Sequence, residues 1–90
     1  MDVKIDDYSQ GDKNYVDYLV TGLTDDQLKF IQDNLEEEIE MDGDNLKIRM
    51  YFDDNLFPFN SDEAKFKLND FIAREEIEMN VFLSSFLENL

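Results

Sequence analysis

The chain has 90 residues, 23 of them acidic and 8 basic, and its formal net charge is −15. Charge of this sign and size excludes nucleic acid and anionic membranes as direct partners and favours a cationic partner. The sequence contains no cysteine and no histidine, which excludes disulfides, thiolate zinc sites and the commonest general base of enzymes.

The first predicted element is a β-hairpin. Residues 3–8 (VKIDDY) and 14–22 (NYVDYLVTG) are rich in Val, Ile and Tyr, which favour strands. Residues 9–13 (SQGDK) contain a glycine and have the length of a hairpin turn. The N-terminal segment therefore predicts two antiparallel strands.

A helix is predicted to begin near Asp25. Thr24 and Gln27 have the spacing of a capping box, in which the Thr hydroxyl accepts a free backbone N–H and the Gln side chain returns to the cap. We expect the helix to continue to the segment MDGD at residues 41–44, which ends it. Four apolar residues recur at helical spacing and form its predicted buried stripe: Leu28, Ile31, Leu35 and Ile39.

The clearest predicted strand follows at residues 45–53. Its apolar residues occupy alternate positions from Leu46 to Phe52, and Lys47, Arg49 and Tyr51 lie between them, which is the period of a half-buried strand. Residues 53–60 (DDNLFPFN) are predicted to form a loop, because Pro58 favours extended geometry in the residue before it.

A second helix is predicted over residues 62–90, which contain neither glycine nor proline. Asn60 and Glu63 repeat the capping-box spacing at its start. Residues 76–83 also alternate as a strand would, so a break between residues 75 and 80 stays open. The predicted buried stripe comprises Ala64, Leu68, Phe71, Ile72, Met79, Phe82, Leu83, Phe86 and Leu90.

Together these elements predict one α+β domain over residues 1–90, a small antiparallel sheet of about three strands with two helices packed on it. The sequence begins with an acidic segment and has no long apolar run. We therefore expect neither a signal peptide nor a membrane span, and a cytoplasmic location.

Acidic residues on the first predicted helix are the main candidate for function. At about 100° per residue they project opposite the buried stripe, and their spacing is similar to that of successive phosphates along a nucleic-acid strand. Anions at the C-terminal end of a helix oppose its dipole, so this arrangement has an energetic cost that favours a functional role over a merely solvated surface. Asp26, Asp33, Glu37 and Glu40 form a row, Asp25 and Glu36 flank it, and Asp42 and Asp44 extend it past the C-terminal turn. These eight carboxylates are the candidate partner-binding residues.

Phe30 lies on the acidic side of this predicted helix, between Asp26 and Asp33. An exposed aromatic side chain surrounded by carboxylates would resemble an interface hot spot, and we include Phe30 among the candidate partner-binding residues. The alternative is that Phe30 packs under a neighbouring loop, which is the commoner arrangement for a lone aromatic residue.

Other sites receive little support from the sequence. EIEMDGDNLKIR, residues 38–49, resembles a calcium-binding loop in its first positions, but its twelfth residue is Arg49, where a bidentate Glu is required. Ser84 and Ser85 have no base to activate them, and no glycine-rich phosphate loop occurs. We therefore expect no enzymatic activity, no metal site and no cofactor.

The short chain, its acidity and its carboxylate-rich first half resemble small phage-encoded DNA mimic proteins, which block restriction enzymes, CRISPR effectors or other nucleic-acid-binding proteins. This resemblance implies an inhibitor that occupies the basic cleft of a nucleic-acid-binding protein in the host cytoplasm. Two alternatives stay open. An immunity or antitoxin protein would bind a cationic toxin, and a structural adaptor would assemble through its apolar C-terminal helix. That helix end also leaves a homodimer open, through Leu83, Phe86, Leu87 and Leu90.

Overall fold

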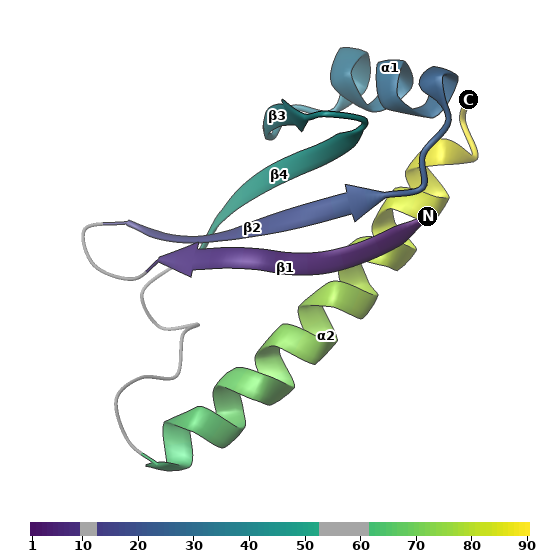
Figure 1. The fold of residues 1–90 in the computed structure, drawn as a ribbon. Coiled ribbons are helices and arrows are strands. Elements are labelled where there is room, and N and C mark those ends of the chain that lie inside the picture. The colour runs from purple at the N-terminus through teal and green to yellow at the C-terminus, as the bar shows by residue number, and fades with distance from the viewer. Residues whose placement is uncertain (10–12, 53–61) are drawn as a thin grey trace.

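The computed structural model describes residues 1–9, 13–52 and 62–90, and the side chains of residues 62–68 are not described. The chain forms an α+β domain in which two helices pack on a four-stranded antiparallel sheet (Figure 1). The predicted class is therefore confirmed, with one strand more than the three that the sequence suggested. The predicted loop at residues 53–60 and the cap at Asn60 lie outside the described residues.

The sheet has the strand order β1-β2-β4-β3, so β1 and β3 form its two edges. The predicted N-terminal hairpin is confirmed as β1 (Asp2–Ser9) and β2 (Asn14–Thr21), and the strand predicted at 45–53 is β4 (Asn45–Phe52). β4 pairs with β2 on one side and with β3 (Glu38–Asp42) on the other. The sheet thus brings the acidic segment at residues 38–42 next to β4.

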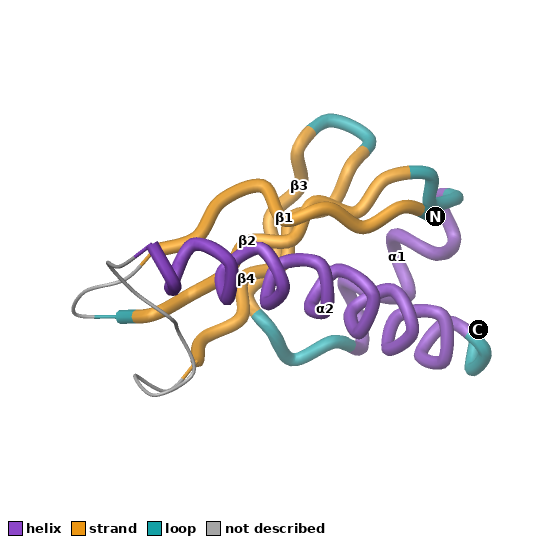
Figure 2. Tube along the Cα trace, turned by 90° about the horizontal axis from the view of Figure 1, so that it is seen from below, coloured by secondary structure: helices purple, strands orange, loops and turns teal. Residues whose placement is uncertain are grey.

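Both helices lie on the same face of the sheet, and α2 (Asp62–Leu87) crosses it obliquely (Figures 1 and 2). The alternating apolar residues of β2 and β4 point to this face and form the core with apolar residues from the helices. We call it the covered face. Its fully buried side chains are Val16, Tyr18, Val20, Ile31, Leu46, Ile48 and Leu83.

The start of α1 (Asp25–Asn34) is as predicted. The backbone N–H of Gln27 donates to the Thr24 hydroxyl at 3.2 Å, and the Thr24 N–H donates to the Gln27 side chain at 2.9 Å. These two bonds form the capping box, and Asp25 and Asp26 in the first turn interact favourably with the positive end of the helix dipole.

The predicted end of this helix near residue 40 is wrong. α1 ends at Asn34, Leu35 is extended (φ −85, ψ 130), and residues 38–42 form β3. A longer helix would have placed four glutamates at its negative end, where the dipole and their mutual repulsion both oppose them. As a strand, the same segment sets Glu38 opposite Arg49 and Glu40 opposite Lys47. Backbone pairing with β4, together with packing of Ile39 against the core, therefore favours the strand.

The segment at residues 41–44, which was predicted to end the first helix, instead contains the turn that connects β3 to β4. Asp42 pairs with Asn45, so Gly43 and Asp44 form a two-residue hairpin turn. Gly43 has φ +61, a left-handed conformation in which a residue without Cβ is favoured. The turn therefore explains the glycine within this acidic segment.

The second predicted helix is confirmed as one continuous element, α2, with no break between residues 75 and 80. Of the predicted stripe, Phe71, Met79 and Leu83 are buried, and Ile72 and Phe86 pack partly against the core. Phe82 and Leu90, which the stripe also included, are exposed. Ala64 and Leu68 lie among the side chains that are not described.

Candidate functional site

The second face of the sheet, which we call the open face, carries polar and charged side chains. Strand alternation places Lys47, Arg49 and Tyr51 of β4 on this face, opposite the buried Leu46 and Ile48. Register then adds their direct neighbours from the adjoining strands: Tyr15, Asp17 and Leu19 from β2, and Glu38 and Glu40 from β3. Asp17 is buried among its neighbours, and the other side chains of this set are partly or fully exposed.

Arg49 organises the centre of the open face. Its Nε and Nη2 atoms donate to the two carboxylate oxygens of Asp17 at 2.7 and 2.9 Å, a bidentate ion pair. The guanidinium also lies 3.8 Å from the ring centroid of Tyr15. Hydrogen bonding to Asp17 raises the pKa of Arg49 above its usual value. Arg49 is therefore fixed by its own chain, and Asp17 neutralises its charge.

Lys47, the other cation on this part of the face, also has an internal partner. Its Nζ lies 3.1 Å from the Asp6 carboxylate of β1, and the hydrogen bond to Asp6 raises the pKa of Lys47. The more distant charges of Asp42 and Glu40 act in the same direction. The two cations thus take their short contacts from β1 and β2 and leave the β3 carboxylates directed outward.

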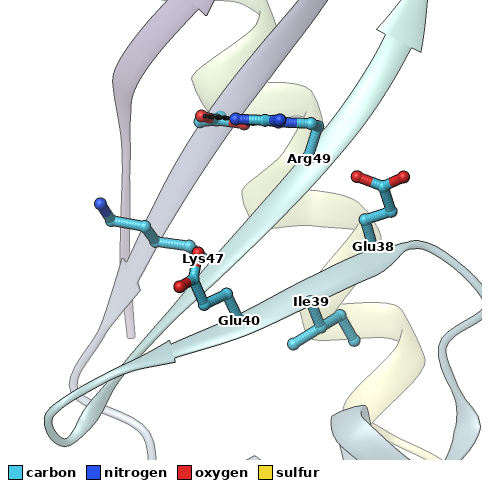
Figure 3. A pocket seen from close by; sticks show the side chains of 6 residues that line it. Glu38, Ile39, Glu40, Lys47 and Arg49 are labelled. Carbon is cyan, nitrogen blue, oxygen red and sulfur yellow. Dashed lines mark hydrogen bonds and ion pairs between the residues drawn. The ribbon is translucent and has the colours of Figure 1, made fainter.

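A hollow of about 360 Å³ lies on the open face, over the paired strands β3 and β4, and Asp17 of β2 also lines it. Lys47 and Arg49 rise from β4 on one side of it, and Glu38 and Glu40 project from β3 on the other, with Ile39 pointing away from both carboxylates (Figure 3). The Tyr51 hydroxyl donates to Glu38 at 3.0 Å, and this hydrogen bond raises the pKa of Tyr51. A hydroxyl partner leaves the negative charge of Glu38 in place.

Six carboxylates lie within nine residues at this edge of the sheet, and we call them the acidic strip. Two of them, Glu38 and Glu40, line the hollow. All six residues are exposed, and no basic residue interrupts the segment. Residues two apart on a strand lie about 6.6 Å from each other on one face, the scale of the spacing between successive phosphates. Three members share the open face in this way. The acidic strip consists of Glu36 and Glu37 in the loop after α1, Glu38, Glu40 and Asp42 on β3, and Asp44 in the turn.

The structure places five of the predicted carboxylates in the acidic strip and the other three, Asp25, Asp26 and Asp33, on α1. Glu36, Glu37, Glu40, Asp42 and Asp44 belong to the acidic strip, although a loop, a strand and a turn carry them instead of one helix. Asp25 and Asp26 are exposed in the first turn of α1, about 12 Å along the helix axis from Asp33. The single row of carboxylates predicted along one helix is therefore wrong.

Phe30 is not the exposed aromatic residue that its predicted position suggested. It is half-buried, and its ring lies 5.2 Å from that of Phe86 in α2, at an interplanar angle of 56°. The pair joins α1 to α2. Phe30 therefore packs within its own chain, as the alternative interpretation of the sequence had it, but its neighbour is a helix and not a loop. A role for Phe30 as an interface anchor is therefore not supported by its position.

The apolar end of α2 mostly packs within its own chain. Leu83 is fully buried, Phe86 and Leu87 pack partly against the core, and Leu90 is 61% exposed. A homodimer through these residues stays a prediction. Of the four apolar residues, Leu90 exposes the largest fraction of its surface to a second copy.

Two further findings concern the part of the chain that the structure describes. No group of three or more carboxylates in it is arranged to hold a metal ion. None of its helices combines the length and hydropathy that a bilayer crossing requires.

The sequence model of a family described as a family of unknown function, DUF5750, matches residues 2–89. The chain belongs to this family. The match includes all four strands and both helices, so the acidic strip and the open face are parts of the DUF5750 domain. Among curated proteins, none matches the chain.

Sequence reasoning missed Glu38 and the Asp17–Arg49 pair of this DUF5750 domain. Glu38 belonged to the predicted helix, but the alternation of acidic and apolar residues from Glu38 to Asp42 already has the period of a strand. The Asp17–Arg49 pair joins strands 32 residues apart in sequence, and only the register of the sheet brings them together.

Proposed function

We propose that this protein is a non-catalytic inhibitor of the DNA-mimic type, whose acidic strip occupies the basic cleft of a nucleic-acid-binding protein. The observation that carries the proposal is the strip itself, six exposed carboxylates in nine residues along one edge of the sheet. Arg and Lys side chains that normally contact phosphates would meet carboxylates at a similar spacing.

The charge of the strip exceeds what the fold requires. Edge strands are commonly protected from pairing with other chains by one or two charged residues, very often lysine. On β3, three carboxylates share one side of a five-residue strand, and lysine at any of these positions would have reduced the net charge of −15. Like charges this close repel one another, and a cationic partner would relieve that repulsion.

The open face supports the same function because its cations are already engaged. Asp17 holds Arg49 and Asp6 holds Lys47, so neither is free to neutralise the strip fully. The rigid pairing of β3 with β4 fixes the carboxylates of Glu38, Glu40 and Asp42 relative to one another. A fixed array binds with a smaller loss of conformational entropy than charges on a mobile tail.

The test is capture of the partner with three forms of the protein. One is the wild type, one carries Glu38→Gln, Glu40→Gln and Asp42→Asn, and the control carries Asp25→Asn, Asp26→Asn and Glu88→Gln, which removes the same charge elsewhere. We expect the wild type and the control to retain a basic protein at low salt and to release it at high salt. The strip variant should retain about ten-fold less.

The captured protein must then bind DNA or RNA, and the wild-type inhibitor must displace that nucleic acid in a mobility-shift assay. A captured partner that binds no nucleic acid, such as a basic toxin, would contradict the mimic mechanism. Equal capture by the strip variant and the wild type would exclude the acidic strip as the binding surface.

A further inference from the structure

The outer side of α2 carries apolar side chains that the core does not use. Ile77 is 66% exposed and Val81 is 61% exposed. At about 100° per residue, these two project together, on the side of the helix opposite the buried Met79. A single exposed apolar residue is ordinary, but two residues four apart form a continuous contact surface on a helix.

These side chains form one wall of a groove between α2 and the start of β1. The groove has a volume of about 410 Å³, and the N-terminal end of β1 lies beside the C-terminal half of α2 (Figure 1). Most of its lining is contributed by α2. The lining residues are Ala73, Glu76, Ile77, Asn80 and Val81 from α2, and Asp2, Val3 and Lys4 from β1.

The edge of β1 beside the groove is poorly suited to pairing with another strand. The backbone N–H of Ile5 donates to Glu76 of α2 at 3.3 Å, so this edge donor is already used. The pairing of β1 with β2 is also irregular between Ile5 and Asp7, which bends the edge. An added strand would therefore find an interrupted edge, whereas a helix could pack on Ile77 and Val81 without using backbone hydrogen bonds.

Charge around the groove indicates the chemistry of the partner. Residues 69–90 contain five acidic residues and one basic residue, Arg74. The groove cation Lys4 lies 3.8 Å from Glu76 and is partly neutralised by it. A second copy of the chain would bring the same acids face to face, whereas a basic helix would complement them. Of these five acids, Glu76 lines the groove together with Asp2 of β1, Asp70 and Glu78 are exposed on α2, and Glu88 is exposed just after its end. Glu75 faces the covered side, where it accepts a hydrogen bond from Tyr18.

We propose that the groove between α2 and β1 docks a cationic amphipathic helix of a partner protein. Apolar residues of that helix contact Ile77 and Val81, and its Lys or Arg residues meet Asp2 and Glu76 in the groove and the exposed acids of α2. The site is separate from the acidic strip, because β1 and β3 are opposite edges of the sheet. The two surfaces therefore bind independently.

The probe is a helical peptide of about 18 residues, about 27 Å long, with leucines on one face and lysines and arginines elsewhere. A control peptide has the same composition with its leucines distributed around the helix. We expect the first peptide to bind the wild type at least ten-fold more tightly than the control in fluorescence anisotropy. In NMR spectra of the labelled protein, the shifted amide signals should be those of residues 73–84 and of β1.

Substitution of the two apolar residues identifies the site. Ile77→Ser with Val81→Ser should weaken peptide binding at least ten-fold, and the fold should persist because both side chains are exposed. Tyr8→Ser, at the far end of β1, is the control and should leave binding unchanged. The neutralised-strip variant should also bind the peptide normally, which separates this proposal from the function of the strip.

Three outcomes would overturn the inference. Equal binding of both peptides would mean that charge alone attracts them. Unchanged binding by the double serine variant would place the contact elsewhere. A wild-type dimer in sedimentation that dissociates on the same double substitution would show that a second copy, not a basic helix, occupies the groove.

Discussion

The covered and open faces of the sheet differ in what they contribute to stability. On the covered face, alternate residues of β2 and β4 are fully buried against α1 and α2, so their apolar area contributes directly to folding. On the open face, alternate residues of the same strands are partly exposed and charged, and β3 adds further acids. One strand such as β4 therefore carries core residues and candidate binding residues at adjacent positions.

The acidic character of the chain is therefore separable from its folding. Because the apolar residues on the covered face supply the core, the residues of the open face can carry many charges without loss of the fold. The limit is the repulsion between like charges, which destabilises the folded state. The ion pair of Asp17 with Arg49 is the exception, because it lies on the open face and yet contributes to the structure of the sheet.

The largest expected effect comes from adjacent residues on opposite faces. Ile48→Ala removes a fully buried side chain and should lower the free energy of unfolding by about 2–5 kcal/mol, because a cavity remains in the core. Lys47→Ala, one residue earlier, should leave stability nearly unchanged. Urea denaturation of both variants measures the difference, and similar losses for the two would contradict the division between faces.

A smaller loss is expected where the open face has a structural contact. Arg49→Lys keeps the charge but loses the bidentate bond to Asp17 and the planar contact with Tyr15. Its denaturation midpoint should fall between those of Ile48→Ala and Lys47→Ala. The converse change, Lys47→Arg, is the control and should have no comparable effect. A wild-type midpoint for Arg49→Lys would mean that the pair is dispensable.

The smallest effect concerns a carboxyl on the covered side. Tyr18, fully buried, donates its hydroxyl hydrogen to Glu75 of α2 at 3.1 Å, and partial burial raises the pKa of Glu75 above its ordinary value of 4.5. A carboxyl with a raised folded-state pKa costs no stability while protonated in both states. Its cost appears as pH rises through 4.5 and is complete above the folded pKa.

Glu75→Gln should therefore stabilise the protein at pH 7 by about 0.5 kcal/mol after solvent screening, and the gain should shrink towards pH 4. Gln retains an oxygen that can accept from Tyr18. Glu88→Gln removes the same charge at an exposed position and is the control for general repulsion. A gain that is equal for both variants, or independent of pH, would show that burial of Glu75 is not its cause.

Local signals in the sequence were sufficient for much of the fold. The capping box at Thr24, the alternation from Leu46 to Phe52 and the uninterrupted segment after Asp62 each predicted an element that the structure contains. The end of α1 was not predicted, because the apolar residues at 35 and 39 fit a helical stripe as well as a strand. Pairing with β4 selects the strand over the helix, and a short segment of sequence does not show which strands will pair.

The sequence identified most residues of the candidate site but not their arrangement in space. The acidic segment drew attention to Glu36, Glu37, Glu40, Asp42 and Asp44, and these residues do form one continuous segment at the β3 edge. The placement of Glu40 and Asp42 on a strand, and the position of Asp25 and Asp26 at the far end of α1, followed from tertiary contacts. Two local features indicated that the helix ended earlier: the glutamates at the unfavourable end of the predicted helix and the alternation of acidic and apolar residues from Glu38 to Asp42.

The most direct test of this account measures stability and binding in one variant, Glu38→Gln with Glu40→Gln and Asp42→Asn. Removing three like charges from β3 should leave the free energy of unfolding unchanged or higher, because repulsion falls and no core contact is lost. Affinity for the captured basic partner should fall at least ten-fold, with a weaker dependence on salt. Unchanged affinity, or lower stability, would contradict the claim that these carboxylates serve binding rather than folding.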